Sequence, residues 1–255
     1  MGDTLQQAQD RPPIPLAEGQ IPSALPLARG QIGNMRLIGR FDGIMKAAEK
    51  RIAMDYFETV KKRRSVCRFS DRPVANKDIM AMLEAAVLAP SATNEQPWYF
   101  IVIRDKNIRE AMRDAVSAMV GAVTASTDDK QRKKRLAWMR SYSTHFADAP
   151  VAIAVLAQPW VGGGYSGPTD PARRDLALES VAMAVAHLQL AATALGYSSC
   201  FASSPAEFAR EEIEAILNVE KPWFLAGIIS LGIAAKRPGK RPARKSAAEV
   251  CTFIG

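Results

Sequence analysis

The segment that decides the fold is APSATNEQPW, residues 89–98. Pro90 and Pro97 restrict the backbone at its two ends, while Ser91 and Asn94 offer polar groups beside exposed backbone donors. A flat ring with a polar edge needs such a segment, because amide groups can match the edge and small residues allow close approach. Taken alone, the composition also suits an ordinary turn between a helix and a strand.

Apolar periodicity places this segment between a helix and a strand. Upstream, apolar residues from Ile79 to Val87 recur with helical spacing, and Pro90 ends that helix because it cannot supply the next backbone donor. Downstream, residues 98–103 form an apolar run rich in aromatic and β-branched side chains, which predicts a buried strand. Further strands are predicted at residues 151–157, 197–202 and 225–231.

Further helices are predicted around these strands. Asp55 is a suitable N-cap for a short helix that runs toward Lys62. Ser204 is a suitable N-cap for a later helix, with Pro205 at its first position and Glu207 completing a capping box. Longer helices are predicted at residues 108–120, 129–140 and 173–195. The apolar side chains of the last one spread around more than one face, which is typical of a helix buried in a core or a subunit interface.

The chain divides into two regions. Residues 1–43 are punctuated by prolines and show no sustained periodicity, which predicts an extended or partly disordered arm; it could wrap around a partner subunit or be a loose tail. Residues 44–255 predict one domain of the α/β (α+β) class, in which helices cover a small mixed or antiparallel sheet. Within it, the glycines and prolines of residues 162–171 predict a surface loop.

Bulk composition limits the compartment and the partners. Hydrophobic residues make up 48% of the chain and charged residues 24%, as in a soluble globular protein, and the formal net charge of +8 favours an anionic partner. Cys67, Cys200 and Cys251 are far apart in sequence, which argues against a disulfide framework or a zinc site. With only His145 and His187 available, no metal site is expected. Because no apolar run reaches the ~18–20 residues of a bilayer span and no signal-peptide profile is present, a cytoplasmic protein without membrane contact is expected.

Two basic segments could bind an anion. Arg63, Arg64 and Ser65 begin the motif RRSVCRF, and guanidinium groups beside a hydroxyl bind phosphate well. Near the C-terminus, residues 239–245 include Arg244. Each segment alone is more typical of a solvated helix end or tail. A nucleic-acid-binding protein could use the same charges, but the sequence holds no nucleic-acid-binding motif, so no such partner is expected.

Together, these segments resemble the nitroreductase family of FMN-dependent NAD(P)H oxidoreductases. The family's opening motif is similar to RRSVCRF, and its second motif, Ala-Pro-Ser-x-x-Asn-x-Gln-Pro-Trp, matches residues 89–98 at nearly every diagnostic position. The likeness covers about residues 55–255. It implies a three-layer fold, a bound FMN, and an intertwined homodimer with each flavin at the subunit interface.

The resemblance also implies which residues contact FMN. Arg63, Arg64 and Ser65 match positions that contact its phosphate and ribityl chain, and Arg244 matches a basic residue that closes on the phosphate. A second group matches the loop that lies against the flavin, often supplied by the other subunit, and a third matches a segment beside the isoalloxazine ring. These are Pro90, Ser91, Ala92 and Asn94 in the loop, and Ala202, Ser203 and Ser204 beside the ring.

Cys67 departs from the family pattern. The matching position usually holds Arg or Lys near the pyrimidine end of the flavin, where a positive charge stabilises the anionic reduced ring. The resemblance therefore predicts a flavin that is harder to reduce than in relatives, unless Arg68 or another cation substitutes. A small buried residue without a redox role is the simpler interpretation of Cys67.

The implied reaction is a ping-pong transfer of electrons from NADH or NADPH through FMN to a small acceptor such as a nitroaromatic or a quinone. No catalytic side chain is expected, because the flavin carries the chemistry. Two alternatives remain open. One is a specialised flavin reaction, such as reductive dehalogenation, enoate reduction or flavin fragmentation, and the other is a flavin-binding protein without turnover.

Overall fold

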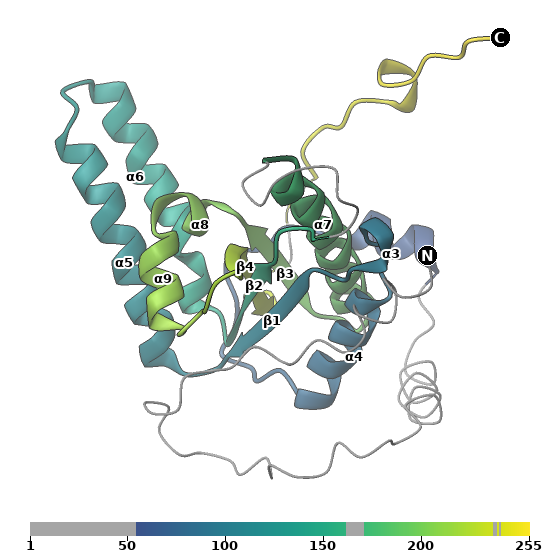
Figure 1. Ribbon diagram of the computed structural model, residues 1–255, viewed down its shortest axis with the longest axis horizontal. Coiled ribbons are helices and arrows are strands. Elements are labelled where there is room, and N and C mark those ends of the chain that lie inside the picture. Colours follow the sequence, from purple (N-terminus) through teal and green to yellow (C-terminus); the bar gives the residue numbers. More distant parts are fainter. Residues whose placement is uncertain (1–54, 162–170, 237–238, 240) are drawn as a thin grey trace.

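The computed structural model describes residues 55–161, 171–236, 239 and 241–255. The arm predicted at residues 1–43 lies outside these described residues, as does most of the predicted surface loop at 162–171. Helices lie on both faces of a central sheet (Figure 1). Two separate hydrophobic cores, one on each face, give the three layers that the sequence resemblance implied.

The sheet has four strands in the order β1-β2-β4-β3. Their bounds are β1 Trp98–Ile103, β2 Val151–Ala157, β3 Ser198–Ala202 and β4 Phe224–Gly232. Each neighbouring pair is antiparallel, so the small sheet expected from the sequence is antiparallel rather than mixed across the described residues. Every residue of β2 and β4 is buried, because helices cover both faces of the two central strands.

One face of the sheet carries the first core. Helices α4 (Asn76–Val87) and α7 (Pro171–Ala194) pack there against each other and against the sheet, and α3 (Tyr56–Lys62) lies beside α7. Apolar side chains from all these layers meet in the core, for example Met82 of α4, Ile153 of β2 and Leu188 of α7, and all three are fully buried. Burial of this kind contributes about 1.5–3 kcal/mol for each large side chain.

The opposite face carries the second core. Helices α5 (Lys106–Ala125) and α6 (Lys130–Thr144) form a hairpin that projects beyond the sheet, and α8 (Ser204–Phe208) and α9 (Arg210–Ile216) pack beside it (Figure 1). Met112 and Val116 of α5 and Ile213 of α9 are buried in this core. Short 3-10 turns complete the structure at η1 (Ala92–Asn94), η2 (His145–Asp148) and η3 (Ala247–Glu249).

Two of the predicted N-caps can be compared with the observed starts of α3 and α8. The side chain of Asp55 accepts hydrogen bonds from the backbone nitrogens of Phe57 (2.9 Å) and Glu58 (3.3 Å), which confirms the predicted N-cap of α3. The capping box predicted at Ser204 is wrong. Ser203 occupies the N-cap position without a side-chain bond, and the buried Ser204 hydroxyl instead bonds Ser143 Oγ at 2.7 Å. Because the Ser204 hydroxyl is used in this buried pair, it does not cap the helix.

Helix α7 differs from the sequence-based expectation in one way. Among the described residues, it alone is long and apolar enough to cross a membrane, by length and composition only, although no such run was expected. Its buried residues form one stripe that faces α4 and the sheet, which is typical of a core helix. The remaining side is open in a single chain, where Met183 is 38% exposed, so burial of that side at a subunit interface stays a prediction.

Gly227 marks a point where β3 and β4 approach too closely for a side chain. A Cβ there would lie 2.7 Å from the backbone oxygen of Ala202 and from ring atoms of Phe201. We expect Gly227→Ala to lower the free energy of unfolding by about 1–3 kcal/mol, measured by urea titration. Gly121→Ala in α5 is the control, because nothing lies within 4 Å of its added Cβ. This control should gain about 0.5–1 kcal/mol, and equal midpoints for the two variants would contradict the close strand approach.

Candidate functional site

The segment that carries the predicted phosphate-binding arginines follows α3 and runs along the edge of the sheet. Ser65 forms a parallel bridge with Ser199 of β3, and the nitrogen of Val66 donates to the Ser199 carbonyl at 3.1 Å. Further along, the nitrogen of Ser70 donates to the carbonyl of Ile233, just after β4, at 2.8 Å. The segment is thereby fixed between the start of β3 and the end of β4.

A cavity of about 300 Å³ lies beside this segment. Arg64, Ser65 and Cys67, all predicted to contact the cofactor, line it together with Arg68. The opposite wall comes from the chain that follows β4, at Ala235, Lys236, Gly239 and Pro242. The structure thus brings part of the first motif and part of the C-terminal segment to one cavity, while Arg63 and Arg244, also predicted to contact the cofactor, are not among its lining residues.

Several positively charged side chains lie at or near this cavity. Arg241 donates to three carbonyls at the end of α3, the closest being that of Lys61 at 2.7 Å. Partial desolvation, followed by the nearby charges of Arg64 and Arg244, lowers the pKa of Arg241. Arg64 Nε is buried and has no hydrogen-bond partner within the described part of the chain. An unmet donor among repelling guanidinium groups fits a phosphate, which would accept the bond and offset the charge.

The C-terminal arginine singled out from the sequence is only part of this arrangement. Arg244 is exposed, and its Nη1 donates only to the adjacent carbonyl of Ala243, at 3.2 Å, in the contacts described. Arg241, which sequence reasoning missed, is the residue that joins the C-terminal segment to α3. Its position three residues upstream in the same basic cluster gave no signal that would separate the two.

The second motif forms a strained loop after α4. Thr93, Asn94 and Gln96 all have positive φ angles, of 51°, 58° and 52°. Such angles are unfavourable for residues other than glycine, and most of all for β-branched Thr, so the surrounding contacts must hold them. Ser91 Oγ accepts from the nitrogen of Gln96 at 2.9 Å, and Trp160 Nε1 donates to Thr93 Oγ1 at 3.0 Å. Strain of this kind clusters at ligand sites.

Within one chain, the two motifs lie far apart along the length of α7. The nitrogen of Ala92 donates to Ser180 Oγ, in the first half of the helix, at 3.2 Å. Ser65 instead pairs with β3, which follows the end of α7 at Ala194. The helix rise of 1.5 Å per residue separates Ser180 from Ala194 by about 20 Å. One chain therefore does not bring Pro90, Ser91, Ala92 and Asn94 to the arginine cavity.

The third predicted group lies at the far end of β3. Ser203 is exposed and lines a cavity of about 340 Å³ with Phe201 and residues of α7 and α8. Ala202 is buried, and the hydroxyl of Ser204 is occupied by Ser143. Of these three residues, only Ser203 presents its side chain to a described cavity.

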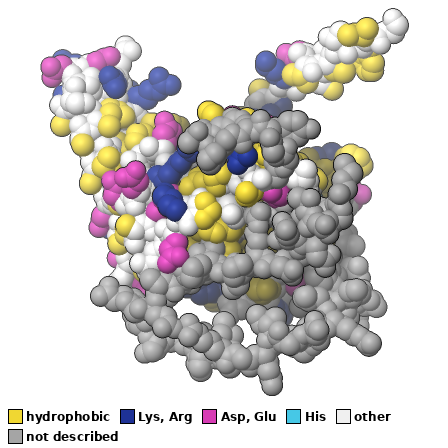
Figure 2. Space-filling model, viewed as in Figure 1, with side chains coloured by type: hydrophobic (Ala, Val, Ile, Leu, Met, Phe, Trp, Pro, Cys, Tyr) yellow, Lys and Arg dark blue, Asp and Glu magenta, His cyan; other side chains and the backbone are white. Residues whose placement is uncertain are grey.

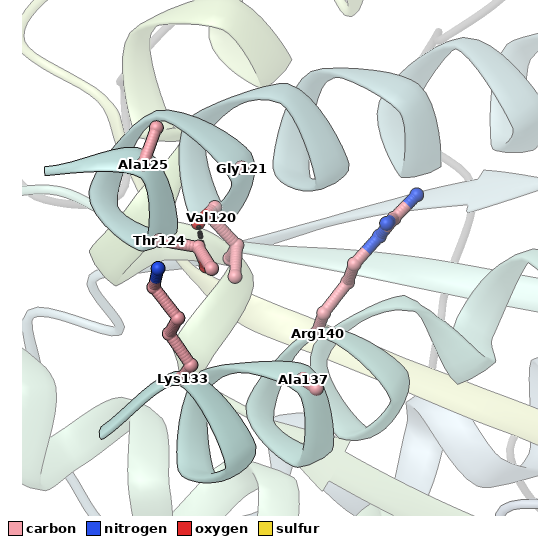
Figure 3. Close-up of a pocket in the computed structure, with 7 residues that line it drawn as sticks. All are labelled: Val120, Gly121, Thr124, Ala125, Lys133, Ala137 and Arg140. Carbon is pink, nitrogen blue, oxygen red and sulfur yellow. Dashed lines mark hydrogen bonds between the residues drawn. The ribbon is translucent and has the colours of Figure 1, made fainter. Parts of the chain in front are cut away.

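A further cavity, of about 490 Å³, lies between α5 and α6. Figure 3 shows Lys133 and Arg140 of the basic helix on one side of it, and Thr124 and Val120 of α5 on the other. None of the residues predicted from the two motifs lines it.

Two cysteines and a histidine meet next to the arginine cavity. Sγ of Cys67, Sγ of Cys200 in β3 and a ring nitrogen of His145 in η2 all lie within 4.8 Å of one another. The wide sequence spacing of the cysteines argued against a disulfide framework or a zinc site, but the fold brings Cys67 and Cys200 together. Sequence reasoning missed the cluster because its members come from three distant elements and share no local motif.

This cluster changes the ionisation of its members. The neighbouring Cys200 and His145 side chains lower the pKa of Cys67 to about 5, although its partial burial opposes this. The Cys67 contact and burial raise the pKa of Cys200. Burial works against protonation of His145, but its contacts with Cys67 and with the carbonyl of Tyr142 outweigh burial and raise its pKa. Cys67 is therefore a thiolate at neutral pH.

Residues 60–233, more than half of the chain, match the sequence profile of the nitroreductase family. The chain belongs to the nitroreductase family. Among relatives by sequence, protein DrgA of Synechocystis sp. is 28% identical over 190 residues, covering 74% of this chain and 89% of that protein.

Solved structures agree with the nitroreductase fold. A BluB-like flavoprotein from Clostridium difficile 630 is 29% identical, with a TM-score of 0.70 over 80% of this chain and 100% of its own. An iodotyrosine deiodinase bound to FMN and 3-iodo-L-tyrosine is 24% identical, with a TM-score of 0.61 over 78% of this chain and 100% of its own.

The thiolate at Cys67 predicts alkylation at unusually low pH. In the reduced protein with a chelator present, we expect the rate of iodoacetamide reaction at Cys67 to be half-maximal near pH 5, because contacts with Cys200 and His145 stabilise the anion. Peptide mass spectrometry measures the rate at each pH. The exposed Cys251 of the same chain serves as an internal reference for the reactivity of iodoacetamide. A Cys67 midpoint at the ordinary thiol value of about 8.5 would contradict the assignment.

Proposed function

We propose that this protein is an FMN-dependent oxidoreductase that passes electrons from NADH or NADPH to a small acceptor, a nitroaromatic or a quinone, in the cytosol. The observation that carries the proposal is the arginine cavity, where Arg64 Nε lacks a partner within the described residues and positive charges repel one another. Membership of the nitroreductase family, and a fold neighbour bound to FMN, support phosphate of FMN as the missing anion.

The residues present suit particular parts of FMN. Arg64 and Ser65 would bind the phosphate, and Arg244, which is free to move, would close over it. The loop with Ser91 and Asn94 would offer amide and hydroxyl groups to the edge of the ring. When bound, FMN accepts a hydride and passes electrons on, so the protein's part is to bind, orient and shield the ring.

A homodimer would complete the site, because the two motifs lie far apart along α7 in one chain. Large apolar side chains that a partner could cover are exposed on α3, where Tyr56 is 64% and Phe57 68% exposed. The C-terminal segment stands away from the body (Figure 1), and apolar side chains are visible along it (Figure 2). Phe253 and Ile254 in this segment are 95% and 97% exposed. These surfaces support an intertwined dimer.

A second candidate reaction is reductive dehalogenation. It is favoured by the fold neighbour whose bound ligand is 3-iodo-L-tyrosine. The cavity between α5 and α6 supplies two cations, Lys133 and Arg140, that could attract an acidic acceptor. Both candidate reactions use the same flavin site and differ only in the acceptor.

The proposed function predicts a yellow protein. The purified protein should contain one FMN per chain, and NADH or NADPH should bleach it anaerobically because the hydride reduces the ring. Adding a nitroaromatic, a quinone or an iodophenol to the bleached protein then identifies the acceptor by the return of the yellow colour. A colourless protein that cannot be reconstituted with FMN would overturn the proposal. A yellow protein that neither nucleotide bleaches would favour a flavin-binding protein without turnover.

A site shared between subunits predicts complementation. Arg64→Gln and Asn94→Ala should each weaken FMN binding by about tenfold to a hundredfold, because each removes a polar contact from every site of a homodimer. In a mixed dimer, one site carries both substitutions and the other carries neither. Half of the sites should then regain normal affinity, measured by flavin fluorescence quenching.

Arg113→Gln is the control, because Arg113 forms only exposed ion pairs on α5 within the described part of the chain. It should bind FMN normally. If mixed dimers recover no sites while both single variants bind weakly, the two residues act within one chain and the shared site is wrong.

A further inference from the structure

The cluster of Cys67, Cys200 and His145 has the composition and geometry of a metal site. Its three ligand atoms lie within 4.8 Å of one another. Zinc bonds of about 2.3 Å to sulfur and 2.0–2.1 Å to nitrogen place tetrahedral ligands about 3.5–3.8 Å apart. Inward shifts of at most about 1 Å would therefore close the cluster on one ion, within the reach of side-chain rotation.

His145 is already oriented as a ligand. Its Nδ1 contacts the carbonyl of Tyr142, and a proton on Nδ1 donating to that carbonyl leaves Nε2 with a free lone pair. Nε2 is buried and has no hydrogen-bond partner within the residues that the structure describes. His145 as a whole is only 6% exposed. Metal-binding histidines commonly use one nitrogen for a backbone carbonyl and the other for the metal.

A second buried polar atom also lies beside the cluster without a partner. Ser230 of β4 pairs with Cys200 across the sheet, so the two side chains are on the same face. The Ser230 hydroxyl is fully buried and makes no hydrogen bond to the described residues. A water on the metal could satisfy it.

We propose that Cys67, Cys200 and His145 form a binding site for a thiophilic transition metal, with Zn²⁺ as the ion that fits best. Two thiolates and an imidazole are soft and borderline ligands that suit Zn²⁺ and exclude Mg²⁺ and Ca²⁺, which require oxygen. Three protein ligands leave one of the four zinc positions for a water or a small ligand. The site shares Cys67 with the wall of the arginine cavity, and zinc binding there does not require a bound flavin.

Access also fits this site. Cys67 lines the arginine cavity and is only half-buried, so an ion can enter from there. Both sulfurs bind zinc as thiolates, so any S–H bond still present at Cys67 or Cys200 breaks as the bond to zinc forms, and its proton passes to solvent.

The test is Zn²⁺ binding to the reduced, full-length protein as purified with its flavin. Native mass spectrometry counts zinc and FMN separately on each chain, so loss of one does not imitate loss of the other. We expect one Zn²⁺ per chain, and competition with a chromophoric chelator should show at least a hundredfold weaker binding for Cys67→Ser. The matched controls Cys251→Ser and His187→Asn lie outside the cluster and should bind like the parent.

X-ray absorption at the zinc edge keeps the test decisive where Cys200→Ser or His145→Asn does not fold. It should show two sulfurs at about 2.3 Å and one nitrogen at about 2.0–2.1 Å. Failure to bind stoichiometric Zn²⁺, unchanged affinity in Cys67→Ser, or a shell of oxygen and nitrogen alone would each overturn the proposal.

Discussion

The antiparallel pairing of β4 with β2 and β3 determines where Cys200 lies in the candidate site. Strands β2 and β4 are buried along their full length, so their backbone groups can only be satisfied by each other and by the outer strands. The register of β3 on β4 then sets Cys200 opposite Ser230. A slip of one residue would turn Cys200 to the other face of the sheet and away from His145. The chemistry at Cys67 thus depends on a register set several residues away.

Much of the fold could be predicted because its signals are local. The apolar runs at 98–103 and 151–157 match β1 and β2 at both ends, and Asp55 caps α3 as expected. Predictions failed where a distant partner intervenes. Ser204 looked like a helix cap, but a buried bond to Ser143, on another helix, holds its hydroxyl. Strand order could not be predicted either, because periodicity does not say which strands pair.

The candidate site shows the same division. Arg64 and Ser65 could be found because they share one short motif with a known chemical use, and they do line one cavity. Cys200 and His145 lie far from Cys67 in sequence, and neither belongs to a motif, so only folding brings their atoms together. For the second motif, the sequence predicted only a loop. Its three positive φ angles indicate backbone strain, which composition alone does not reveal.

Charge links the two parts of the site. The Cys67 thiolate places one negative charge beside guanidinium groups that suit an anion. Zn²⁺ bound by two thiolates and a neutral imidazole would carry no net charge, so metal binding would remove that negative charge from the wall of the cavity. An anionic cofactor would then be held more firmly, and by reciprocity it would favour the metal.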